Sequence, residues 1–161
     1  MEFRLLLQGL GEEIGLADLR PDEDGTCRLG MDDMIVDMKA TGDGRHVLLF
    51  GEIAPLPQER REELVMQLLG GNFHVQSQGT AGAALGLDVD THTLYLQQME
   101  SLDGLDELAF AKLLETFANT MESWKKLLAD FALQAESAPA QEEQPADEIS
   151  FGLSGMNIFR A

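Results

Sequence analysis

Apolar residues recur every three or four positions at the start of the chain. The apolar positions of this stretch are Phe3, Leu6, Leu7, Leu10 and Ile14. This spacing places them on one side of an α-helix, while the acidic residues between them fall on the other side. The pattern predicts a first helix that ends near Gly15.

The pattern then changes to an alternation of apolar and polar residues with a period of two. The segments "TCRLGM" (26–31) and "MIVDMK" (34–39) alternate in this way and are joined through Asp32 and Asp33. A third segment, "RHVLLFGEI" (45–53), follows "TGDG", whose Asp-Gly pair suits a tight hairpin turn. We therefore predict three antiparallel strands.

Helical spacing returns after Pro57, a residue that suits the first turn of a helix. Acidic residues favour the amino end of this segment, and its apolar stripe consists of Leu64, Val65, Leu68 and Leu69. The prediction is a second helix that begins at Pro57 and stops at Gly70 and Gly71.

Two short strands and a long helix complete the pattern. The segments "GAALGLDV" (82–89) and "THTLYLQQM" (91–99) read as strands with a turn from Asp88 to Thr91. From Leu105 onward, apolar residues are spaced by alternating threes and fours, so this last helix should cover the sheet. Its stripe consists of Phe110, Leu113, Phe117, Met121, Trp124, Leu128 and Phe131.

This order of elements, α-β-β-β-α-β-β-α, is typical of an α+β domain. We expect a twisted, mainly antiparallel sheet with helices packed on it, formed by residues 1–135. Residues 136–150 contain two prolines, many charges and no aromatic residue, and are predicted to be a flexible linker. Apolar character returns in residues 151–161, "FGLSGMNIFRA".

The charge of the chain narrows the classes of function. Its 161 residues include 29 acidic and 11 basic side chains, for a formal net charge of -18. Phosphate backbones would be repelled, so nucleic acid is not expected as a partner, whereas a basic or amphipathic polypeptide would be attracted. One cysteine, no apolar leader and no run long enough to cross a membrane predict a cytoplasmic protein.

No motif carries the residues that catalysis or cofactor binding needs. The segment "GTAGAALG" (79–86) lacks the lysine of a phosphate-binding loop. The segment "DVDTH" (88–92) resembles the start of an aspartate-based phosphotransferase motif, but a hairpin turn explains it better. His46, His74 and His92 lie in three separate segments. Cys27 is expected to pack as a small apolar residue. We predict no catalytic residue, no metal and no cofactor.

Methionine is frequent in the first predicted hairpin, at Met31, Met34 and Met38. Methionine adapts to irregular surfaces, so this hairpin either forms a groove for varied apolar side chains or simply packs in the core. The residues leave both interpretations open.

Several segments together resemble the class I type III secretion chaperones of the Tir-chaperone (CesT-like) family, over residues 1 to about 135. The resemblance is carried by five segments: "IGLADLRPDEDGTCRL", "VLLFGEI", "LPQERREELVMQLLGGN", "GAALGLDVDTHTLYL" and "FANTMESWKKLL". It implies a non-enzymatic protein that binds the amino-terminal segment of a secreted effector in extended form, without ATP, and keeps it soluble and competent for secretion. An alternative on the same fold is a regulatory protein that sequesters a transcriptional regulator or another secretion component.

The resemblance also implies a homodimer that uses the second helix and the strand after it. The candidate dimer contacts are Val65, Leu69, Leu85 and Leu87, which alternatively fill the core of the single chain. The candidate effector-binding residues are Phe3, Leu7, Leu10, Met31, Met34, Val36 and Met38.

The resemblance says nothing of the carboxyl-terminal segment. Its apolar residues, candidates for docking onto a client groove, are Phe151, Leu153, Met156, Ile158 and Phe159. Two alternatives stay open: recruitment of a component of the secretion apparatus, and a disordered end without a partner.

Overall fold

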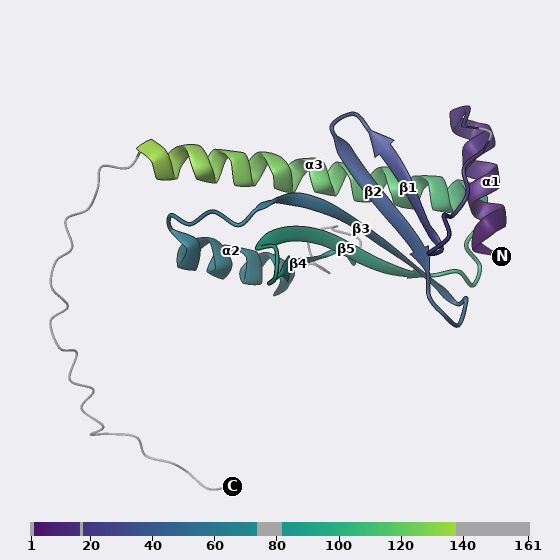
Figure 1. The fold of residues 1–161 in the computed structure, drawn as a ribbon, viewed down its shortest axis with the longest axis horizontal. Coiled ribbons are helices and arrows are strands. Elements are labelled where there is room, and N and C mark those ends of the chain that lie inside the picture. The colour runs from purple at the N-terminus through teal and green to yellow at the C-terminus, as the bar shows by residue number, and fades with distance from the viewer. Residues whose placement is uncertain (1, 17, 74–81, 138–161) are drawn as a thin grey trace, which may run out of the picture.

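The computed structural model describes residues 2–16, 18–73 and 82–137, and has the order of elements that the sequence predicts (Figure 1). The helices are α1 (Phe3–Ile14), α2 (Arg61–Phe73) and α3 (Glu107–Ser137). The strands are β1 (Thr26–Met31), β2 (Met34–Ala40), β3 (His46–Pro55), β4 (Ala84–Asp88) and β5 (Thr93–Ser101). The predicted linker and apolar tail lie outside the described residues from residue 138 onward.

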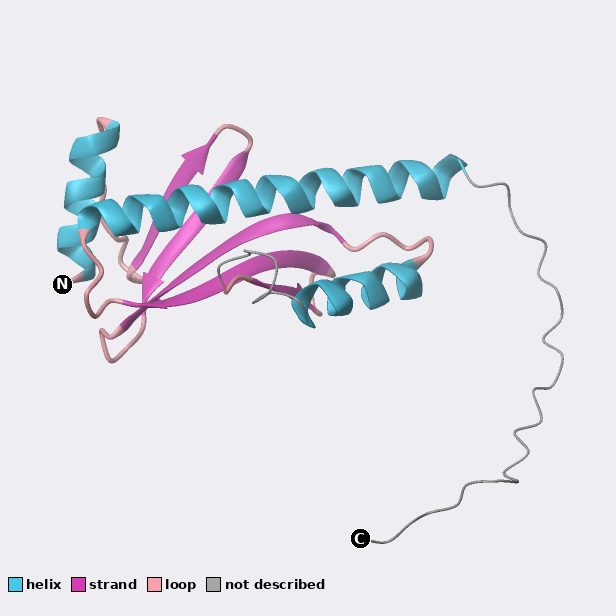
Figure 2. Cartoon of the chain, turned by 180° about the vertical axis from the view of Figure 1, so that it is seen from behind, coloured by secondary structure: helices cyan, strands magenta, loops and turns pink. Residues whose placement is uncertain are grey.

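All five strands form one twisted sheet in the order β1-β2-β3-β5-β4, and each neighbouring pair is antiparallel (Figure 2). Successive side chains of a strand point to opposite faces, so the alternation in the sequence divides each strand between core and surface. In β3, for example, Val47 and Leu49 are fully buried, whereas Leu48 and Phe50 are only half-buried. The predicted α+β fold is confirmed.

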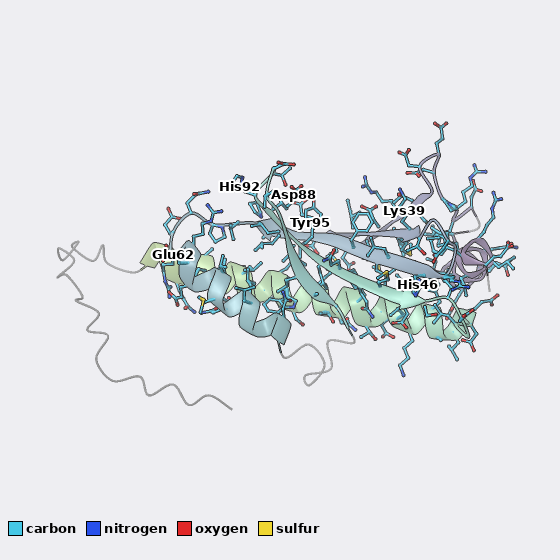
Figure 3. All side chains as sticks on the ribbon, turned by 90° about the horizontal axis from the view of Figure 1, so that it is seen from below. Lys39, His46, Glu62, Asp88, His92 and Tyr95 are labelled. Carbon is cyan, nitrogen blue, oxygen red and sulfur yellow. The ribbon has the colours of Figure 1, made fainter. Side chains whose placement is uncertain are left out.

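The core lies between the sheet and α3, which runs along nearly the whole sheet (Figure 2). Phe110, Phe117 and Met121 of the predicted apolar stripe are completely buried, and Leu113 and Trp124 are half-buried against the same core. Figure 3 shows α2 and α3 on the same side of the sheet. The expectation that this long helix covers the sheet is confirmed.

The hairpin of β1 and β2 diverges from the rest of the sheet. Strand β2 pairs with β3 only from Asp37 to Ala40, whereas its first half pairs with β1 alone. At the point of divergence lies Gly51, where a Cβ would sit 2.5 Å from Met121 and 2.8 Å from the carbonyl oxygen of Ile35. Glycine therefore permits the close approach of β2, β3 and α3 here.

The predicted limits of the second helix are wrong at both ends. The helix begins at Arg61, four residues after Pro57, because Arg60 has a left-handed backbone with φ of 50°. It continues through Gly70 and Gly71 to Phe73. A Cβ at Gly71 would lie 2.8 Å from the Trp124 ring, so this glycine allows α2 to pack closely on α3 and does not end the helix.

Candidate functional site

An apolar groove of about 610 Å³ lies between α1, the β1–β2 hairpin and α3. We call it the N-terminal groove. Its apolar lining consists of Leu10, Ile14, Leu16, Leu29, Met31, Met34, Ala111, Leu114 and Ala118. Its volume falls within the range of about 300–1,000 Å³ that is usual for ligand sites. Three separate elements form its walls.

The first wall is built by the end of α1. Gly15 takes the left-handed conformation with φ of 76°, and its N–H and that of Leu16 both donate to the carbonyl of Gly11. This cap turns the chain sharply and leaves Ile14 and Leu16 on the groove. The two side chains are 45% and 49% exposed, so they are available to a partner.

The second wall is the β1–β2 hairpin, in which Met31 and Met34 flank a two-residue turn. Asp32 in this turn has φ of 52°, a conformation that tight hairpin turns require. Lys125 of α3 donates to the carbonyl oxygen of Asp33 at 3.1 Å, with the Asp33 carboxylate 3.5 Å away. This contact holds the tip of the hairpin against α3.

The polar residues that line the groove give it a negative potential. Glu13, Asp32, Glu115 and Glu122 surround the apolar lining, and no lysine or arginine is among the lining residues that the structure describes. A bound segment with basic residues beside apolar ones would therefore be favoured over an acidic segment.

The structure divides the seven predicted effector-binding residues into two groups. Leu10, Met31 and Met34 line the N-terminal groove. The other four, Phe3, Leu7, Val36 and Met38, are buried in the core. Leu10 and Met34 are also buried, at 4% and 8% exposure, so the accessible large apolar side chains of the groove are those of Met31, Ile14 and Leu16.

Sequence reasoning missed most of the α3 wall of this groove. Ala111 and Ala118 are small residues seven positions apart, and Leu114 lies between them. Small residues on one helix face leave space beside the larger ones, so this spacing was the available signal. The sequence analysis also did not select Ile14 or Leu16 as binding residues, because Ile14 belongs to the stripe of the first helix and Leu16 lies just after that helix.

A second exposed apolar surface lies on α2 and on β4 with its following turn. We define the α2–β4 surface by Met66, Leu69, Leu87 and Val89, which are 71%, 59%, 39% and 70% exposed. It contains two of the four predicted dimer contacts, Leu69 and Leu87. Of the other two, Val65 is half-buried and Leu85 is buried.

Asn72 connects α2 to β4 at this surface. Its side-chain Nδ2 donates to the carbonyl oxygen of Leu85 at 3.0 Å, and its Oδ1 accepts from the Leu85 N–H at 2.8 Å. Strand β4 is an edge of the sheet, so these two backbone groups point away from its neighbour β5. The Asn72 amide thus occupies one position of the edge, in the manner of a neighbouring strand.

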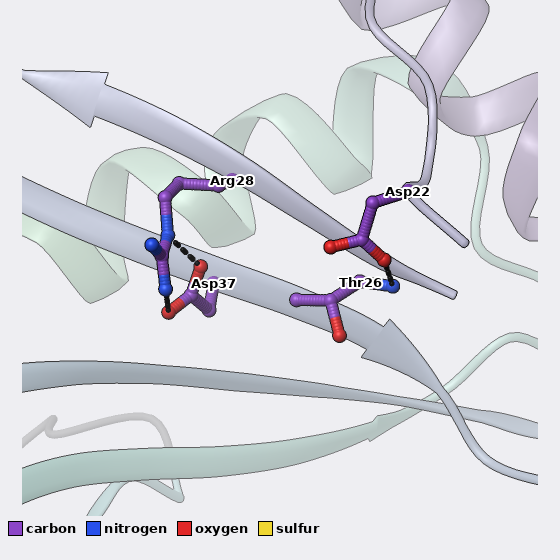
Figure 4. A network of polar contacts seen from close by, with 4 residues as sticks. All are labelled: Asp22, Thr26, Arg28 and Asp37. Carbon is purple, nitrogen blue, oxygen red and sulfur yellow. Dashed lines mark hydrogen bonds and ion pairs between the residues drawn. The ribbon is translucent and has the colours of Figure 1, made fainter. Parts of the chain in front are cut away.

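Polar residues on the sheet face opposite α3 are paired with one another (Figure 4). Arg28 donates to both carboxylate oxygens of Asp37, at 2.7 and 2.9 Å, and this bond raises the pKa of the arginine. The Asp22 carboxylate accepts from the N–H groups of Asp24 and Thr26. These contacts stabilise the hairpin.

The remaining candidate chemical groups take structural positions. Burial raises the pKa of the Cys27 thiol, and the nearby Asp22 carboxylate adds to that effect, so the reactive thiolate is disfavoured. Asp88 accepts from the N–H groups of Asp90 and Thr91, as expected of a turn. Within the described ranges, no three histidine, cysteine or acidic side chains gather as they would around a metal ion. His74 lies outside those ranges.

Solved structures of other proteins share this fold. A chain of the ExsC–ExsE complex has a TM-score of 0.68 at 23% identity, covering 80% of this chain and 97% of that one. A chain of the HopA1–SchA chaperone–effector complex has a TM-score of 0.66 at 20% identity, covering 77% and 93%. One from the heterodimeric ExoU–SpcU complex of the Pseudomonas aeruginosa type III secretion system has a TM-score of 0.57 at 20% identity, covering 78% and 96%. A comparison with curated protein sequences finds no match.

This fold is therefore the one found in a solved chaperone–effector complex and in a complex from a type III secretion system. The model of the Tir chaperone protein (CesT) family matches residues 5–125, and the chain belongs to that family. This confirms the resemblance found in the sequence. The family is one of chaperones. None of the helices in the described part of the chain has the length and apolar character needed to cross a membrane.

Proposed function

We propose that this protein is a cytoplasmic chaperone that binds the amino-terminal segment of a secreted effector in extended form. The N-terminal groove receives apolar side chains of the segment, and its acidic rim attracts basic ones. Binding alone, without a chemical step, keeps the segment soluble and competent for secretion. The observation that carries this proposal is an open apolar groove on the fold of a chaperone family.

The size of the groove sets the scale of the affinity. Three buried aliphatic side chains contribute about 5 to 9 kcal/mol. Ordering a disordered segment costs roughly 2 to 5 kcal/mol of this. A single groove therefore supports weak binding, and a client that also contacts the sheet or a second groove binds more tightly.

A homodimer would supply the second groove. We place the subunit contact on the α2–β4 surface, with the predicted contacts Leu69 and Leu87 beside Met66 and Val89. Val65 and Leu85 support this surface from the interior of the chain. Exposed apolar side chains of this size are usual at subunit interfaces.

The test uses full-length protein and the amino-terminal segment of a candidate effector, chosen from the genes that neighbour its own. The double variant Ile14→Glu/Leu16→Glu places two carboxylates on the groove wall, and calorimetry should show binding at least 100-fold weaker. The control is Leu108→Glu, because Leu108 is 75% exposed at the start of α3 and is not among the groove residues. Thermal unfolding confirms that the variants fold.

Equal binding by the double variant and the unmodified protein would contradict the groove as the client site. Failure of the unmodified protein to bind any effector segment would contradict the function. Tight binding of a transcriptional regulator in place of an effector would instead favour the regulatory alternative.

A further inference from the structure

The chain carries an apolar segment of its own, residues 151–159. We propose that these residues dock into the N-terminal groove of the same chain and compete with the client. Docking itself is independent of what the client is, whereas the competition rests on the function proposed above.

The first argument is reach. The described chain ends with α3 at Ser137, and the α3 residues that line the groove span 111–122. At 1.5 Å per residue, Ser137 lies about 22 to 39 Å along the helix from these residues. Residues 138–150 number 13 and span up to about 43 Å when extended, which is enough to return along the helix to the whole groove.

The second argument is the pattern of side chains. Phe151 and Leu153 are two positions apart, as are Met156 and Ile158. In an extended segment the two side chains of each pair lie on one side, and the two pairs face opposite sides. One pair at a time therefore points into the groove, as alternate side chains of an extended client would. The N-terminal groove is apolar and open along one side, with Ile14 and Leu16 half exposed.

The third argument is charge. The apolar segment carries Arg160 and no acidic residue, whereas residues 138–150 carry four acidic residues and no basic one. The groove rim is acidic. The rim therefore attracts Arg160 beside the apolar segment and repels the connecting residues, so charge favours docking of the apolar segment over the connecting one.

The tether determines how strong the effect is. A short flexible connection gives an effective concentration on the order of 1 mM. If the separate segment binds the groove with a dissociation constant of about 100 μM, the docked form exceeds the open form by about tenfold. A client then binds about tenfold more weakly than it would to an empty groove.

The docking test needs no client. A fluorescent peptide of residues 151–161 is titrated against the unmodified full chain and against the full-length variant Leu153→Asp/Ile158→Asp, whose own segment cannot dock. We expect the peptide to bind the variant at about 100 μM and the unmodified chain at least tenfold more weakly. Hydrogen exchange at residues 10–16 should also be faster in the variant.

A matched pair of variants locates the peptide. Adding Ile14→Glu/Leu16→Glu to the tail variant should abolish peptide binding, whereas adding Met66→Glu/Leu69→Glu on the α2–β4 surface should not. Equal peptide binding by the unmodified chain and the tail variant would overturn the proposal. So would a result in which the substitutions on the α2–β4 surface abolish peptide binding and those in the groove do not. Protection that disappears on dilution would show docking into a second copy and overturn docking within one chain.

The client measurement separates the two proposals. The tail variant should bind the effector segment about tenfold more tightly than the unmodified chain. If the peptide docks but client affinity is unchanged, the client does not use this groove and the competition is wrong. If the client binds through the groove and the peptide never docks, the docking proposal fails while the chaperone function stands.

Discussion

The two ends of the molecule both expose apolar side chains, but in different settings. At one end, α1, the β1–β2 hairpin and α3 surround a groove with an acidic rim. At the other end, large side chains project from α2 and from the edge strand β4. A groove receives side chains one by one from a flexible segment, whereas an exposed helix face and strand edge suit a folded partner. We therefore propose that the client binds at the first end and the second subunit at the other.

The two ends also differ in how their helices are attached. Helix α1 packs on α3 through Phe3 and Phe110, whose rings meet edge to face with centroids 6.4 Å apart. Helix α2 packs on α3 through the close approach of Gly71 to Trp124 and on β4 through Asn72. The first attachment includes this pair of aromatic rings, whereas the second combines an apolar contact with the two hydrogen bonds of Asn72. The substitutions that follow test this difference.

The largest effect is expected at the groove end. Phe110→Ala removes a completely buried ring and should lower the free energy of unfolding by about 3 to 5 kcal/mol, measured by urea denaturation. Leu108→Ala, two residues away and 75% exposed, should change it by less than about 0.5 kcal/mol. If Phe110→Ala lowered the free energy of unfolding as little as Leu108→Ala does, the attachment of α1 through this apolar contact would be contradicted.

The second effect concerns the subunit contact. Met66→Asp/Leu69→Asp should weaken the proposed homodimer at least 100-fold, because exposed apolar side chains at the contact are replaced by like charges. Light scattering over a range of concentrations measures the change. Ile14→Glu/Leu16→Glu at the other end should leave the dimer intact. If only this groove variant became monomeric, the groove and not the α2–β4 surface would be the subunit contact.

The third effect tests the hydrogen bonds of Asn72. Asn72→Ala removes both bonds to Leu85 and should cost about 1 to 3 kcal/mol, with faster amide exchange at Leu85. The matched control is Asn119→Ala, because Asn119 is exposed at the groove and lies far from β4. Unchanged exchange at Leu85 would show that α2 does not hold the sheet edge.

A smaller effect is expected for the contact that closes the hairpin. Lys125→Ala should lower global stability by less than about 1 kcal/mol, because Asp33 is largely exposed. The hairpin should open more often, so the buried Cys27 should react with a thiol reagent about two- to fivefold faster. Lys126→Ala removes an exposed pair with Glu122 and should leave this rate unchanged.

The smallest effects lie in two hairpin turns, near His46 at the α1 end and at Asp88 toward the α2 end (Figure 3). Hydrogen bonds from Thr41 and Thr91 lower the pKa of Asp43 and of Asp88. A lowered pKa in the folded state gives stability above about pH 3.9, the unfolded value, that is lost as pH falls through the folded pKa. In NMR titrations, Thr91→Val should raise the pKa of Asp88 and leave Asp43 unchanged.

The sequence predicted the order and type of every element because the periods of two and of three to four residues are long and uninterrupted. It failed at Gly70 and Gly71, where a contact with Trp124 distant in sequence outweighs the local tendency of glycine to end a helix. It also selected Phe3, Leu7, Val36 and Met38 as binding residues. An apolar stripe does not show which of its members lie under the surface, because that depends on the element packed opposite.

The partial pairing of β2 has a mechanical consequence. Only four residue pairs join β2 to β3. Beyond them the hairpin is held by its buried side chains, such as Leu29 and Val36, and by Lys125 at its tip. This wall of the groove therefore has no hydrogen-bonded pairing to β3 and depends on side-chain packing. If the groove is the client site proposed above, we expect this wall to adjust to client side chains of different size more readily than the two helices do.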